Sequence, residues 1–150
     1  MPDEAVPDQG AREQTVAVVE RFMAAMAKLD TEAMLAESAD DILVQLPAAP
    51  PGLPREAEGK VEFTGFLAGV SALWRSFSLV RCAVHPLADQ PDRAVIEYAS
   101  DSVNSDGSPY RNTYLSIATV RNGKLVNFQE FFDPTPVTLS VRALTTGGQG

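Results

Sequence analysis

The sequence predicts an α+β fold in which helices pack on one face of a curved antiparallel sheet. Three observations predict it. Apolar residues recur at helical spacing in the first half of the chain, and a two-residue alternation begins near residue 75 and continues to residue 133. Clusters of turn residues divide that second half. Because the helices come first and the strands follow, the two kinds of element segregate, which is typical of the α+β class.

The first element is an amphipathic helix over residues 12–29. Its apolar residues repeat three, four and seven positions apart and so form one face: Val19, Phe22, Met23 and Met26. Asp30 is suited to cap a short second helix over 31–38. A short strand follows over 39–47, where Ile42, Val44 and Leu46 alternate with other residues.

A proline-rich segment then interrupts the regular elements. Residues 47–59 hold four of the eleven prolines, which predicts an extended loop instead of a helix or a central strand. Apolar residues return at helical spacing after Gly59 and predict a third helix: Phe63, Phe66, Leu67, Val70 and Trp74.

Four strands are predicted in the second half of the chain. They cover residues 75–86, 93–104, 109–121 and 124–133. Turn residues occupy the joints at 88–92, 104–109 and 121–123. Asn122-Gly123 is the strongest hairpin signal of the sequence, because both positions of a two-residue turn of this type need a positive φ.

Composition limits the classes of function. A chain of 150 residues forms one domain, expected over 11–135, with a disordered tail over 1–10 and a C-terminal tail over 136–150. The net charge of −8 argues against nucleic acid and anionic membranes as partners. One Cys and one His exclude a disulfide framework and the usual zinc sites. With no long apolar run and an acidic start, we expect a cytoplasmic protein.

The last two predicted strands carry a recognisable pattern. Residues 110–137, YRNTYLSIATVRNGKLVNFQEFFDPTPV, resemble the C-terminal hairpin of the SnoaL-like, nuclear-transport-factor-2-like superfamily, and locally that of the phenazine-biosynthesis A/B proteins. The order of elements over 11–135 is similar as well. The resemblance implies a cone-shaped curved sheet whose helices close an apolar cavity. It also implies a homodimer formed through the outer face of the sheet.

Positions of known activities can be carried over from this resemblance. The tyrosine, the base and the acid of the ketosteroid isomerases match Phe22, Leu46 and Ser116, so that all three catalytic groups are replaced. We therefore do not expect steroid isomerisation by that mechanism. This loss also keeps open a non-catalytic alternative, a ligand-binding or dimerisation module of the same fold.

Two carboxylates remain at working positions of other relatives. The Asp–Arg–Asp set of the limonene-epoxide hydrolases matches Asp101, Ala99 and Glu130, so the arginine is lost. The acid/base glutamate of the phenazine proteins matches Glu130, whereas their helix histidine matches Phe66. We therefore expect Glu130 as the proton-transfer group and Asp101 as its partner.

Strand parity supports the choice of Glu130. It shares one face with Phe128 and Phe132, where desolvation would raise the pKa of its carboxyl toward neutrality. Two alternatives stay open: Glu130 could pair with Arg111 or Arg81 at the rim, and Asp101 could be an exposed strand end.

These residues predict a pocket for a hydrophobic small molecule, such as a polyketide-like or terpenoid metabolite. The residues expected to line it are Phe22, Leu46, Phe66, Trp74, Asn112, Tyr114, Ser116, Phe128 and Phe132. The expected chemistry is general acid–base isomerisation, cyclisation, dehydration or hydrolysis without a cofactor. Asp133 is expected to end the last strand before Pro134, and His85 to lie at the surface.

Overall fold

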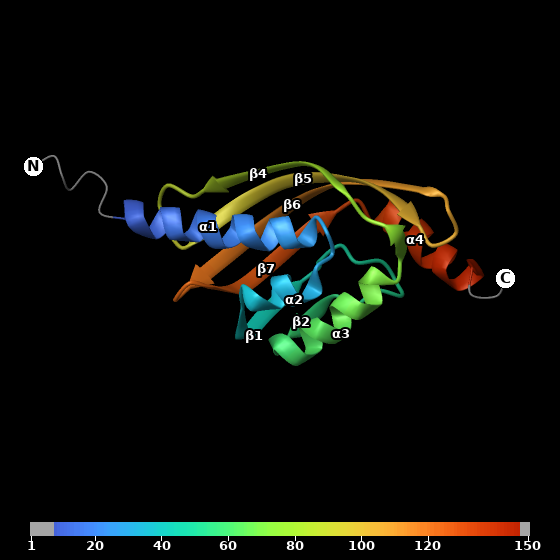
Figure 1. Cartoon of the computed structure of the whole chain (residues 1–150), viewed down its shortest axis with the longest axis horizontal. Coiled ribbons are helices and arrows are strands. Elements are labelled where there is room, and N and C mark those ends of the chain that lie inside the picture. Colours follow the sequence, from blue (N-terminus) through green and yellow to red (C-terminus); the bar gives the residue numbers. More distant parts are fainter. Residues whose placement is uncertain (1–7, 148–150) are drawn as a thin grey trace, which may run out of the picture.

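A computed structural model describes residues 8–147 and shows a curved sheet with helices on one side and at one end (Figure 1). The elements follow one another as α1 (Gln9–Met26), α2 (Thr31–Ala36), β1 (Ser38–Gln45), β2 (Glu56–Glu58), α3 (Gly59–Ser71), β3 (Trp74–Ser76), β4 (Leu79–Pro86), β5 (Arg93–Asn104), β6 (Pro109–Arg121), β7 (Lys124–Phe132) and α4 (Pro134–Gly147). The predicted α+β class is confirmed.

The strands form one sheet in the order β2-β1-β7-β6-β5-β3, with β4 also paired to β5. β1 runs parallel to β7, and the other pairs are antiparallel. The long meander β5-β6-β7 follows the predicted boundaries, except that β7 ends at Phe132, one residue early. A long, twisted and open sheet of this kind curves, and the predicted cone results.

Helices α1, α2 and α3 cover the concave face of the sheet (Figure 1). The predicted apolar face of α1 is buried, with Val19 and Phe22 at most 1% exposed. Inward side chains of the sheet meet this face, including Ile96 and Ala118, which are fully buried. The core therefore lies between α1 and the strands β5 to β7. No helix within the described residues is both long and apolar enough to cross a membrane.

The hairpin between β6 and β7 has the geometry that its sequence predicts. Arg121 pairs with Lys124, and the two residues between them have positive φ, 52° at Asn122 and 74° at Gly123. Two consecutive left-handed residues form the type I′ turn, whose twist matches that of the flanking strands. This turn starts the register of β7, and an irregularity after Leu125 shifts the pairing by one residue, so that Glu130 lies opposite Ser116.

The predicted strand over 75–86 is two strands. β3 pairs with the end of β5, the chain then bends at Phe77 and Ser78, and β4 pairs with the rest of β5. The amide of Ser78 binds Ser102 Oγ at 3.0 Å, and its carbonyl accepts from the amide of Asp101 at 3.0 Å. The bend turns Phe77 inward, where its ring lies 4.8 Å from that of Trp74. Trp74 therefore belongs to β3, and α3 ends earlier than its apolar spacing predicts.

Two further segments differ from their predictions. The proline-rich loop contains the short edge strand β2, which pairs through Glu56 to Glu58 with β1. The tail expected over 136–150 contains most of α4, which is held to the sheet by buried Val137 and Ser140. Of the predicted N-terminal tail, residues 1–7 lie outside the described residues, as do residues 148–150, whereas α1 begins at Gln9.

Candidate functional site

A cavity of about 80 Å³ lies between the concave face of the sheet and the helices. Aromatic side chains dominate its wall: of the eleven Phe, Tyr and Trp residues of the chain, only Phe131 is not part of it. The wall consists of Phe22, Met26, Leu29, Met34, Val44, Leu46, Leu53, Phe63, Phe66, Leu67, Val70, Leu73, Trp74, Phe77, Tyr98, Tyr110, Tyr114, Phe128, Glu130, Phe132 and Val137. One carboxyl group, that of Glu130, therefore faces a space that is otherwise apolar or phenolic.

Seven of the nine residues expected to line the pocket do so. They are Phe22, Leu46, Phe66, Trp74, Tyr114, Phe128 and Phe132. The other two, Asn112 and Ser116, face inward as their parity predicts, but they lie behind the wall, 7% and 0% exposed. The reason is that tyrosines on the same and the neighbouring strand cover them.

Glu130 is the centre of the site. It lies on β7 opposite Ser116 of β6, and its side chain is half-buried. The hydroxyl of Tyr98 donates a hydrogen bond to Glu130 Oε2. No hydrogen bond from the described residues reaches Oε1, and this oxygen is not among the buried, unpartnered polar atoms. Oε1 thus keeps accessible surface and is the oxygen available to a ligand.

The pKa of Glu130 is raised to about 7, mainly because burial removes water from the carboxylate, while the hydrogen bond from Tyr98 opposes the rise. A group with a pKa near 7 accepts and donates protons at neutral pH with comparable ease. Burial and the neighbouring negative charge of Glu130 raise the pKa of Tyr98 well above its usual value, so this phenol stays protonated and remains a donor.

Tyr98 is a site residue that sequence reasoning missed. Its hydroxyl lies 2.6 Å from Ser116 Oγ, in addition to its bond to Glu130. With its one proton on the carboxylate, Tyr98 accepts from Ser116, and the three groups form one hydrogen-bonded chain. The signal was available, because Tyr98 alternates with Ile96 and Ser100 on a face that the strand pattern marks as buried.

A second polar cluster contains Tyr110, Tyr114, Ser100 and Asn112. Asn112 Nδ2 donates to the Asp133 carbonyl at 3.0 Å, and its Oδ1 accepts from the Asp133 amide at 3.2 Å, which fixes the orientation of the side-chain amide. Its Nδ2 also donates to Tyr110 at 3.1 Å. The hydroxyls of Tyr110 and Tyr114 are hydrogen-bonded at 2.8 Å, and those of Tyr114 and Ser100 at 2.9 Å, so the four side chains form one connected network. This cluster is neutral and internally satisfied.

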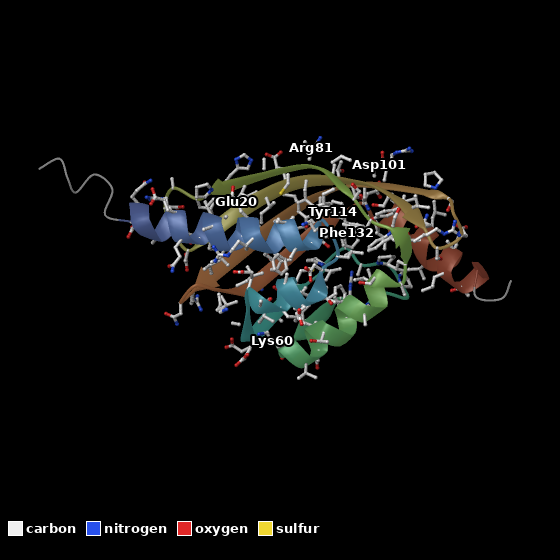
Figure 2. All side chains as sticks on the ribbon, in the orientation of Figure 1. Glu20, Lys60, Arg81, Asp101, Tyr114 and Phe132 are labelled. Carbon is white, nitrogen blue, oxygen red and sulfur yellow. The ribbon has the colours of Figure 1, made fainter. Side chains whose placement is uncertain are left out.

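The structure does not bring Asp101 into the site. Its carboxylate is about half exposed on the outer face of the sheet and pairs with Arg111, its neighbour on β6, at 3.1 Å. Figure 2 shows Asp101 near the outer surface with Arg81, whereas Tyr114 and Phe132 lie between the sheet and the helices. Since Tyr98 and Ser100 face inward, the two-residue period turns Asp101 outward. The predicted partnership with Glu130 is therefore absent, and Arg111 is not a partner of Glu130.

Two other polar residues are placed by the structure. Asp133 Oδ1 accepts from the Thr135 amide at 3.0 Å and so caps α4. His85 lies exposed at the surface, as expected, with Nε2 at 2.8 Å from a carboxylate oxygen of Glu97. Neither residue lines the cavity. Within residues 8–147, no three His, Cys, Asp or Glu side chains gather in a way that could hold a metal ion.

A family profile described as a SnoaL-like domain matches residues 19–128. The "Uncharacterized protein YesE" of Bacillus subtilis (strain 168) is 25% identical over 126 residues, which is 83% of this chain and 85% of that protein.

Solved structures share the fold. One described as "Putative Isomerase" from Bacillus subtilis has a TM-score of 0.78 at 23% identity, over 89% of this chain and 96% of that one. Another, described as a "putative polyketide cyclase" from Xanthomonas campestris pv. campestris, has a TM-score of 0.74 at 21% identity, over 87% and 98%. The matched profile covers most of the chain, from α1 to β7, and the chain therefore belongs to the SnoaL-like family.

Proposed function

We propose that this protein is an enzyme that acts on a hydrophobic small molecule by general acid–base catalysis without a cofactor, with Glu130 as the proton-transfer group. The observation that carries the proposal is a single carboxyl group in an aromatic cavity, with Oε1 accessible and a pKa of about 7. Such a carboxyl can move a proton to or from a bound carbon or oxygen atom at neutral pH.

The proposed reaction is an isomerisation, cyclisation, dehydration or hydrolysis. The proposed substrate is a polyketide-like or terpenoid metabolite. Apolar and aromatic walls support a substrate of low polarity. The likeness to a structure described as a polyketide cyclase is consistent with this substrate class. Phe22, Leu46 and Ser116 replace the working groups of ketosteroid isomerases, so Glu130 acts without them.

The test is turnover by the Glu130→Gln variant. Metabolites retained through purification would be identified by mass spectrometry, and their polyketide and terpenoid relatives would then be assayed as substrates. Gln keeps the shape of the side chain but cannot exchange a proton, so we expect turnover to fall by about 10²–10⁴-fold while the fold persists. Asp101→Asn, on the outer face, is the matched control and should keep full activity.

Unchanged turnover in Glu130→Gln would overturn the assignment of the proton-transfer group. Tight binding of a retained metabolite without conversion in the wild-type protein would favour the alternative, a ligand-binding module. The replaced isomerase positions motivate that alternative.

We also propose that two copies pair through the outer face of the sheet. Leu115 and Phe131 are opposite one another on β6 and β7 and are 45% and 37% exposed, as an apolar pair on this face. Sedimentation of the wild-type chain should show a dimer, and Leu115→Glu should yield monomers. A wild-type monomer at micromolar concentration would contradict this pairing.

A further inference from the structure

We infer that the cavity binds a hydrophobic cation, a ligand that carries a positive charge opposite Glu130 and an apolar body among the aromatic rings. The inference rests on the proposed function only in taking the cavity as the ligand site, and it needs no turnover. It names the substrate class by charge, which the acid–base proposal leaves open.

The wall of the cavity is unbalanced in charge. Glu130 is its only carboxylate, and no Lys, Arg or His is among the lining residues. Arg111, a possible partner of Glu130 from the sequence, pairs instead with Asp101 on the outer face of the sheet. A carboxylate in an apolar cavity is costly unless it is paired. Since none of the lining residues carries a positive charge, a cationic ligand is the partner that would stabilise the ionised form.

The rest of the wall is made of aromatic and aliphatic side chains. Ten aromatic side chains face the cavity. The faces of aromatic rings carry partial negative charge and attract organic cations, with indole the strongest. Trp74 packs between Phe77 and Tyr110, with ring-centroid distances of 4.8 and 5.2 Å. These three neighbouring rings can therefore contact the same cation. Surfaces of this kind hold quaternary ammonium groups in other proteins.

The phenol next to Glu130 does not offer its proton to an anion. Tyr98 donates that proton to the Glu130 carboxylate, and its hydroxyl is also hydrogen-bonded to Ser116. An anionic ligand beside Glu130 would therefore meet the carboxylate without a compensating donor from Tyr98. The net charge of −8 adds a long-range field that attracts cations.

The test uses two probes of equal shape and different charge, phenyltrimethylammonium and tert-butylbenzene. Trp74 is the only tryptophan and lines the cavity, so its fluorescence reports binding in the full chain. Rim side chains such as Phe66 and Trp74 are half-buried and can adjust their rotamers to admit a single ring. At pH 8 we expect the cation to bind roughly tenfold more tightly than its neutral isostere.

The pH dependence separates the carboxylate from the rings. The pKa of Glu130 is about 7, so at pH 5.5 its carboxyl is protonated and the preference for the cation should shrink. Glu130→Gln should show the smaller preference at both pH values, since only the rings remain. Asp101→Asn, which removes a carboxylate on the outer face, should behave as the wild type.

Equal or tighter binding of tert-butylbenzene at pH 8 would overturn the inference, and so would failure of both probes to bind. A preference that persists unchanged in Glu130→Gln would overturn the role of the carboxylate in it. Each of these results is independent of the proposed reaction, because turnover by Glu130→Gln is measured separately, on the metabolites retained through purification.

Discussion

Glu130 combines two properties that determine its behaviour, a carboxyl group enclosed by rings and a single hydrogen bond from Tyr98. Enclosure favours the neutral form, and the hydrogen bond favours the ionised form. The first effect is larger, so the pKa rises to about 7. The residue is therefore balanced between acid and base at neutral pH, and its charge affects the stability of the fold.

The first prediction concerns stability against pH. The folded-state pKa of Glu130 lies above its usual value of 4.5, so its contribution favours folding most below pH 4.5 and is lost as pH rises through about 7. The difference between wild type and Glu130→Gln in the free energy of unfolding should change by about 3 kcal/mol across this window. Urea titrations of both proteins at pH 4.5, 6 and 8 measure it.

Because both proteins share all other titrating groups, their difference isolates Glu130. The variant should be closest to the wild type in stability at the lowest pH and gain relative to it as pH increases. A constant difference across the three pH values would show that the carboxyl titrates at its ordinary pKa and is not desolvated.

The second prediction concerns Tyr98. Tyr98→Phe removes the hydrogen bond that lowers the pKa of Glu130, so this pKa should rise above that of the wild type. The variant also leaves Ser116 Oγ buried without its partner, at a cost of about 1–2 kcal/mol in stability. Carboxyl ¹³C NMR of labelled glutamate follows the titration directly. Ser116→Ala, which leaves the Tyr98–Glu130 bond in place, should shift the pKa less.

For single residues, the sequence predicts which side chains face the cavity wherever strand parity alone determines it. Glu130 shares a face with Phe128 and Phe132, and the structure places all three on the cavity wall. The expectation for Asp101 rests on resemblance alone, whereas the parity of β5 directs this side chain outward to Arg111. Tyr98 could not be linked to Glu130 from the sequence, because their contact depends on how far a phenol reaches across β6.

Among the elements, the β6–β7 hairpin is the one that aligns the site, and its turn provides the third prediction. Gly123 has φ 74°, and an added Cβ would lie 3.7 Å from Gln14, so the space is open and only the backbone is strained. Gly123→Ala should therefore cost about 1 kcal/mol in unfolding free energy. Chemical denaturation measures the loss.

Gly65 is the matched control in the same chain. It lies inside α3 with ordinary helical φ, and an added Cβ would meet nothing within 4 Å. Gly65→Ala should thus stabilise the protein by about 0.5–1 kcal/mol through helix propensity. If both variants changed stability in the same direction, positive φ would not be the cause of the loss at Gly123.

The fourth prediction concerns α4. Asp133 caps its first turn through Thr135, and Pro134 occupies the first helical position, where its missing N–H costs nothing. Asp133→Ala should cost about 1 kcal/mol in stability, and Asp133→Asn should retain most of it. Thermal unfolding of the three proteins makes the comparison. Equal losses for Ala and Asn would contradict a capping role.

The same dipeptide shows why this helix was not predicted. An Asp followed by Pro ends a strand and also begins a helix, and the composition after residue 135 favours a tail. Tertiary contacts determine that a helix forms here, because Val137 lines the cavity and Ser140 donates a hydrogen bond to Asn104 of β5.

The bend at Phe77 could not be predicted for a similar reason. The alternating sequence pattern continues through it, whereas the pairing with β5 shifts its register there. By contrast, β5 and β6 match their predicted ends, because turn residues mark both.

At the scale of the whole molecule, charge and aromatic residues separate. Ionisable side chains cover the outside and give the net charge of −8, whereas Glu130 is the one carboxylate on the inner wall within the described residues. The order of helices and strands could be predicted from spacing and turn signals. The position of the cavity could not, because it depends on how the curved sheet and α3 leave space between them.

The hollow arrangement of the aromatic residues has a consequence for how such a protein can change. The rings that would meet a ligand are also the rings that hold the sheet to its helices, since Phe22, Phe63 and Tyr98 are almost fully buried. Reshaping the cavity for a new ligand therefore draws on folding stability at every substitution. Conversely, a ligand that fits completes the packing of the interior, so melting temperature gives a practical screen for candidate metabolites before any reaction is known.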